Sequence, residues 1–127
     1  MPKILIEADS VRLEAELNDS ATADQVYQAL PIAGRVNTWG DEIYFSIPVN
    51  AETEPNATDQ LPAGSLAYWA PGNAFCIIWG PTPASHRDEP RFASAVNPLG
   101  KIIGDLSPLG QIGSGSRIEI RKADQRL

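Results

Sequence analysis

The sequence predicts a mainly β domain, folded as a closed or nearly closed barrel of about eight short strands with one main α-helix. Three observations lead to this prediction. The 127 residues include eleven prolines and ten glycines, which cluster between apolar runs, as is typical of short strands joined by turns. Several runs alternate apolar and polar residues with the period of two expected of half-buried strands. Apolar residues at helical spacing follow in one stretch, near residue 26.

The first two strands are predicted to form a hairpin. In Val11–Leu17 the valine, leucines and alanine face one way, while the arginine and the glutamates face the other. Lys3–Ala8 precedes this strand, with Asp9-Ser10 as the turn. We therefore expect one face of this hairpin to contribute to the core.

The period then changes to that of a helix. Thr22 can act as the N-cap, with the Gln25 side chain reaching back in a capping box. Apolar residues follow at positions 26, 29 and 30, and Pro31 ends the helix.

Strands are next predicted at residues 33–38 and 42–47, around the turn Trp39-Gly40-Asp41. In the second of these strands Ile43 and Phe45 share one face, so we expect both in the barrel core. The remaining predicted elements are a polar surface loop at 50–63, strands at 66–69 and 74–79, a loop at 81–92, a strand at 99–103, one helical turn from 107 and a last strand at 117–121. Pro71-Gly72 fits the centre of a type II turn between two of these strands.

These strands add up to a barrel of one domain covering residues 1–127. Closure removes exposed sheet edges, and a barrel of about eight strands has an interior that side chains can fill. The chain is also short enough to form a single domain.

Composition excludes several classes of function. The net charge of -6 argues against a nucleic-acid partner. The sequence has no stretch of membrane-spanning length, and the N-terminus lacks the apolar run of a signal peptide, so a cytoplasmic protein without a membrane partner is expected. The single cysteine, Cys76, lies among apolar residues and is predicted to be a buried thiol.

A metal site or other cofactor is not expected. The sequence has one histidine, His86, and one cysteine, without a ligand-spaced cluster. Ser85-His86 is interpreted as part of a polar loop, because adjacency in sequence is not the geometry of a catalytic triad. Asp41 and Glu42 are interpreted as a solvated hairpin tip.

Aromatic residues give the candidate binding site. Tyr68 and Trp69 are consecutive in a strand, so their side chains point to opposite faces and one ring should be available outside the core. Tyr44 lies on the face opposite Ile43, and the 81–92 loop supplies a possible rim. The predicted ligand-binding residues are Tyr44, Tyr68, Trp69, His86 and Arg91. We expect a pocket for a planar or carboxylate-bearing ligand, with an aromatic stacking surface and charge-assisted bonds from arginine.

Three segments carry a resemblance to a known family. NTWGDEIYFSIPV (37–49), GSLAYWAPGNAFCIIWGPTP (64–83) and ASAVNPLGKIIGDL (93–106) resemble a prokaryotic family of small cyclophilin-like domains of unknown function. The resemblance implies a cyclophilin-like barrel over most of the chain.

The resemblance also suggests prolyl isomerisation as an alternative function. Cyclophilins are understood to use an arginine near the proline nitrogen beside an apolar pocket. Their phenylalanine-rich stretch ending in Gln-Gly-Gly is absent here, and the early strand carries Glu42 and Tyr44, which leaves Arg35, Arg87 and Arg91 as candidates. The leading hypothesis is therefore a non-catalytic domain that binds a small molecule or an extended peptide. The alternatives are a prolyl isomerase with an altered site and a subunit-type protein interaction domain.

Overall fold

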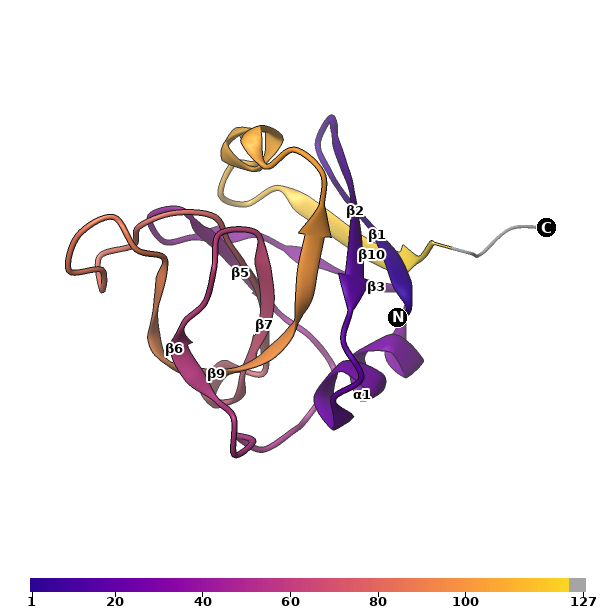
Figure 1. Cartoon of the computed structure of the whole chain (residues 1–127). Coiled ribbons are helices and arrows are strands. Elements are labelled where there is room, and N and C mark those ends of the chain that lie inside the picture. Colours follow the sequence, from indigo (N-terminus) through magenta and orange to yellow (C-terminus); the bar gives the residue numbers. More distant parts are fainter. Residues whose placement is uncertain (124–127) are drawn as a thin grey trace.

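A computed structural model describes residues 1–123 of the chain, which form a barrel with one α-helix at one end (Figure 1). The elements are β1 (Lys3–Ala8), β2 (Val11–Leu17), α1 (Ala21–Ala29), β3 (Ile32–Arg35), β4 (Asn37–Thr38), β5 (Glu42–Ser46), β6 (Thr58–Gln60), β7 (Ser65–Trp69), η1 (Ala70–Gly72), β8 (Ala74–Ile78), β9 (Arg91–Ile103), η2 (Ser107–Gln111) and β10 (Arg117–Lys122). The predicted mainly β fold with one main helix is confirmed.

The strands form an antiparallel sheet in the order β3-β10-β1-β2-β9-β7-β8-β5-β4, and β6 adds to β9. The two ends of this order, β3 and β4, are separated in sequence by Val36 alone. One segment therefore pairs with β10 through its first half and with β5 through its second half. The Val36 amide also donates to the Ser116 carbonyl, at 2.9 Å. The covalent chain through Val36 therefore joins the two ends of the sheet, in place of a hydrogen-bonded pair of strands.

The interior is filled by large apolar side chains from most strands. Phe45 and Phe75 are almost fully buried, and their ring centroids lie 5.7 Å apart. Ile43 is fully buried as well, so the predicted inward face of β5 is confirmed. Gly34 makes room for this packing, because a Cβ there would lie 2.7 Å from Cδ2 of Phe45. Val26 brings α1 into the same core.

The N-cap of the helix lies two residues before the predicted one. Ser20 is the N-cap, and its hydroxyl accepts a hydrogen bond from the Ala23 amide at 3.1 Å. Thr22 is instead buried, with its hydroxyl bonded to Glu54 and to Asn97. The predicted Thr22 cap was wrong because this hydroxyl is used to hold the 50–57 segment against the helix.

Two stretches predicted as loops contain strand. The 50–63 loop includes β6, and β9 begins at Arg91 although the sequence predicted its start at 99. These segments pair with each other, with Thr58 opposite Val96. Each is a strand because of this pairing, which the sequence pattern of neither segment indicates. The type II turn was also wrong: η1 occupies this position, and Asn73 takes the left-handed conformation, with φ of 48°.

Removing the Phe45 ring tests the assignment of β5 to the core. Phe45→Ala should lower the free energy of unfolding by about 3 to 5 kcal/mol, as for other aromatic-to-alanine changes in cores. Ser46→Ala is the matched control, because Ser46 is exposed on the same strand, and it should change stability by less than about 0.5 kcal/mol. Urea denaturation measures both. Equal midpoints for the two variants would contradict the packing described here.

Candidate functional site

The outward face of the β5-β8-β7-β9 part of the sheet carries a second apolar cluster. Strand alternation sends Tyr44 and Trp69 to this face, while their neighbours Phe45 and Tyr68 enter the barrel. The buried members of the cluster are Ala67, Ala74, Cys76, Ile78, Phe92 and Val96. An apolar face outside the barrel is stable only where other segments cover it, and β6 pairs side by side with the first part of β9, which carries Phe92 and Val96 of this cluster (Figure 1).

A cleft of about 130 Å³ opens where this cover is incomplete. Its lining residues are Trp39, Glu42, Tyr44, Trp69, Cys76, Phe92 and Ala93. They come from the turn before β5, from β5 itself, and from β7, β8 and the start of β9. Four of the seven are aromatic, so the cleft has large, rigid walls with a carboxyl group among them.

The Trp69 ring is held in place from two sides. Its indole nitrogen donates to the Ser94 hydroxyl at 2.7 Å, which ties the ring to β9. Gly72 lies against the ring, because a Cβ at that position would be 3.0 Å from two of its carbons. The wall of the cleft is therefore fixed by a hydrogen bond and by close packing before any ligand arrives.

Glu42 is the unusual residue of the cleft. It is only 5% exposed, and the ion pairs among residues 1–123 do not include it. Burial raises the pKa of Glu42 to about 7, while a hydrogen bond with the Cys76 thiol acts in the opposite direction. Burial, together with the nearby Glu42 carboxyl, raises the pKa of Cys76 well above its usual value. Near neutral pH the carboxyl is therefore divided between its neutral and charged forms.

The prediction of a solvated hairpin tip at Asp41 and Glu42 was wrong for Glu42, which is buried, while Asp41 lies half-buried in the turn between β4 and β5. Both residues continue the pairing with the chain around β8: the Asp41 carbonyl accepts from the Trp79 amide, at 2.9 Å, and Glu42 lies opposite Ile78. This register turns the Glu42 side chain toward the outer apolar cluster. The predicted buried thiol of Cys76 is confirmed.

Two of the five predicted site residues, Tyr44 and Trp69, line the cleft. Tyr68 is fully buried on the other face of β7, where its hydroxyl donates to the Val49 carbonyl at 2.7 Å. The same hydroxyl accepts from the Ala51 amide at 3.1 Å. The expectation that only one ring of the consecutive pair would enter the core is confirmed, and Tyr68 is the one that does.

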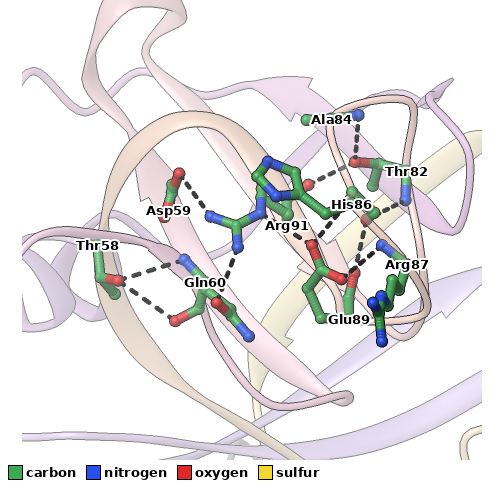
Figure 2. Close-up of polar contacts among 10 residues, drawn as sticks. Thr58, Asp59, Gln60, Thr82, Ala84, His86, Arg87, Glu89 and Arg91 are labelled. Carbon is green, nitrogen blue, oxygen red and sulfur yellow. Dashed lines mark hydrogen bonds and ion pairs between the residues drawn. The ribbon is translucent and has the colours of Figure 1, made fainter.

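His86 and Arg91 do not line the cleft. The Arg91 guanidinium is paired with Glu89 and Asp59, each at 3.0 Å, and also donates to Gln60 (Figure 2). Its expected role as the partner of a ligand carboxylate is therefore replaced by a structural one, because acceptors of the protein surround it.

The loop that carries His86 is fastened by one carboxylate. Glu89 accepts from the amides of His86 and Arg87, at 2.7 and 2.9 Å (Figure 2). These bonds, and the one from Arg91, lower the pKa of Glu89 to about 2. The His86 side chain itself is exposed.

The residues that line the cleft but were not predicted as site residues are Trp39, Glu42, Cys76, Phe92 and Ala93. The alternation of β5 already placed Glu42 on the same face as Tyr44, which was the available signal. The cover that buries this face was not readable from the sequence. No group of acidic, histidine or cysteine side chains suited to a metal ion occurs within residues 1–123, and no helix in that range has the length and apolarity needed to cross a membrane.

Comparison with known proteins agrees with the barrel fold. The family model described as cyclophilin-like matches residues 2–121. The chain belongs to the cyclophilin-like family. The solution structure of the hypothetical protein AF2241 from Archaeoglobus fulgidus is 36% identical, with a TM-score of 0.82 over 96% of this chain and 95% of that one. This cyclophilin-like domain matches no curated protein.

A structure of McbB in complex with tryptophan has the same fold at 13% identity and a TM-score of 0.70. The alignment covers 98% of the present chain and 46% of the McbB chain. At this identity the similarity concerns the fold alone.

Replacing Glu42 tests its burial through the pH dependence of stability. The folded state holds the Glu42 proton more tightly than the unfolded state, so stability should fall as pH rises from about 4.5 through 7. We expect Glu42 to contribute a loss of up to about 3 kcal/mol between about pH 5 and pH 8, and Glu42→Gln to remove that loss. Urea denaturation at several pH values measures the effect.

The control is Glu14→Gln, which neutralises an exposed carboxyl on β2 and should keep the pH dependence of the wild type. Parallel pH profiles for the wild type and Glu42→Gln would show that Glu42 is hydrated in solution.

Proposed function

We propose that this cyclophilin-like domain is a non-catalytic binding module. Its ligand is a small molecule, or a side chain of an extended peptide, that inserts one group into the outer cleft. The observation that carries this proposal is a small cavity with aromatic walls that are fixed in advance, notably Trp69 between Ser94 and Gly72. Preformed walls reduce the entropy lost on binding.

The size of the cleft limits what it takes. Its volume is about 130 Å³, and an apolar cavity of about 150 Å³ engineered in another protein binds benzene. Whole drug-sized molecules need about 300 Å³ or more. The inserted group is therefore about the size of one ring or one side chain, and the rest of the ligand lies on the surrounding surface.

The composition of the cleft favours binding over prolyl isomerisation. An isomerase of the cyclophilin type needs an arginine that converges with the apolar pocket, whereas the charged group that lines this cleft is the carboxyl of Glu42. Arg91, the candidate nearest in sequence to lining residues, is occupied by Asp59 and Glu89. Prolyl isomerisation with an altered site remains the alternative function, and an assay separates the two.

A subunit-type interaction domain has less support. Such a domain needs a contiguous apolar patch on its surface. The exposed large apolar side chains among residues 1–123 are Met1 and Ile103.

A fragment screen read by amide shifts and tryptophan fluorescence tests the binding proposal. Indole is a reasonable first probe, since McbB carries tryptophan in a structure with this fold, and phenol and an Ala-Pro peptide extend the set. We expect shifts confined to the cleft residues. Trp69→Ala should weaken binding by about fivefold or more, since loss of a stacking wall costs on the order of 1 kcal/mol.

Tyr27→Ala is the matched control, because Tyr27 is a half-buried aromatic residue on α1 outside the cleft. It should leave fragment affinity unchanged. Binding that is insensitive to Trp69→Ala, or shifts confined to other surfaces, would overturn the proposal.

Exchange measurements on Ala-Pro and Gly-Pro peptides test the alternative. Uncatalysed cis/trans exchange takes tens to hundreds of seconds at 25 °C. We expect no strong acceleration by this protein, because the cleft lacks a group that would stabilise a twisted imide as arginine does. A known cyclophilin serves as the positive control. Exchange completed within seconds at catalytic protein concentrations would establish the isomerase function instead.

A further inference from the structure

The cleft contains a carboxyl group whose charge the protein leaves uncompensated. Glu42 is nine-tenths buried or more, and the ion pairs of the described residues join other carboxylates. The other titratable side chains lining the cleft are those of Tyr44 and Cys76, and neither can carry a positive charge. Burying an unpaired carboxylate is costly, and a cationic ligand in the cleft would offset that cost.

We propose that the cleft binds an alkylammonium group, with the Glu42 carboxylate as its counter-ion and Trp39, Tyr44 and Trp69 as the aromatic wall around it. The group is the head of a small quaternary ammonium compound, or a methylated amine carried by a larger ligand. This inference rests on the binding function proposed above and specifies the chemistry of the inserted group.

The lining suits a cation of this kind. Aromatic rings attract ammonium groups through their quadrupoles, and quaternary ammonium ions are the usual ligands of aromatic cages. Their methyl groups also make apolar contacts, for which the cleft offers Phe92 and Ala93. The indole N–H of Trp69 is already donated to Ser94, so this ring contributes a surface to the cleft and no additional hydrogen-bond donor.

The charge distribution disfavours the opposite choice. A ligand carboxylate would lie beside Glu42, and like charges at close range repel. The net charge of -6 also attracts cations and repels anions during approach. The carboxylate-bearing ligand expected from the sequence depended on Arg91, which is paired elsewhere.

Titrations with choline test the proposal, because its charge does not change with pH. The neutral probe 3,3-dimethyl-1-butanol has the same shape without the charge. Tryptophan fluorescence at about pH 8 should give a choline affinity at least about tenfold higher than that of the neutral probe. Because protons compete for Glu42, choline affinity should fall by up to about tenfold from pH 8 to pH 6, while the neutral probe should change little.

Two variants separate the effect of the Glu42 charge in the cleft from the effect of the protein's net negative charge. Glu42→Gln keeps the shape of the side chain and should reduce choline affinity to that of the neutral probe, with no pH dependence. Asp88→Asn removes one negative charge from an exposed position in the 81–90 loop and should bind choline as the wild type does. A thermal melt establishes that both variants are folded.

A measurement on the wild type alone gives an independent result. Choline binding at about pH 7 should release roughly half a proton per ligand into a weakly buffered solution, because the cation favours the ionised form of Glu42. Neutral probe binding as tight as choline, or choline binding without proton release, would overturn the ammonium assignment and leave the binding function standing. If choline, the neutral probe, indole and phenol all fail to perturb the cleft, the binding function itself fails.

Discussion

The architecture depends on one bent segment, residues 32–38, which belongs to both ends of the sheet. Its first half pairs with β10 and its second half with β5, so the backbone fixes where β5 lies relative to the rest of the barrel. The seam stays tight because Gly34 has no side chain where the Phe45 ring packs. The position of β5 then determines its register with β8, which places Tyr44 opposite Cys76 on the outer face.

The outer cleft exists because two polar networks hold its cover in place. Asn97 accepts from the Glu54 amide at 2.8 Å and donates to the Glu52 carbonyl at 2.9 Å, which fixes the segment leading to β6. Arg91, at the start of β9, joins β6 to the loop between β8 and β9 through Asp59 and Glu89. These charged and polar groups position the walls, and the ion pairs of the described residues do not include the Glu42 carboxyl in the cleft.

The elements that the sequence predicted well are those whose signal is local. The alternation of β5 predicted burial of Ile43 and Phe45, and the same reasoning predicted that only one of Tyr68 and Trp69 would enter the core. The rest depended on distant pairing. Arg91 finds its partner Asp59 at a separation of 32 residues, so its charge was open to interpretation as a binding group.

The burial of Glu42 was unpredictable for the same reason. Its alternation with Ile43 indicates which face it occupies, but the depth of that face depends on β8 beneath it and on Trp69 and Phe92 beside it. The short strand β6 has no apolar periodicity of its own and exists through its pairing with β9. The local pattern thus predicted the barrel and two of the residues that line the cleft, Tyr44 and Trp69, while tertiary pairing determined the electrostatics.

The neighbouring positions of β1 and β10 have an architectural consequence. The Ala123 amide donates to the Lys3 carbonyl at 3.0 Å, so the end of β10 lies beside the start of β1. Both lie on the side of the barrel away from the 81–90 loop (Figure 1). A domain whose first and last strands end side by side can be inserted into another protein without disrupting the pairing of its own strands. The McbB chain, less than half of which aligns with this barrel, is an example of a longer polypeptide that accommodates the same architecture.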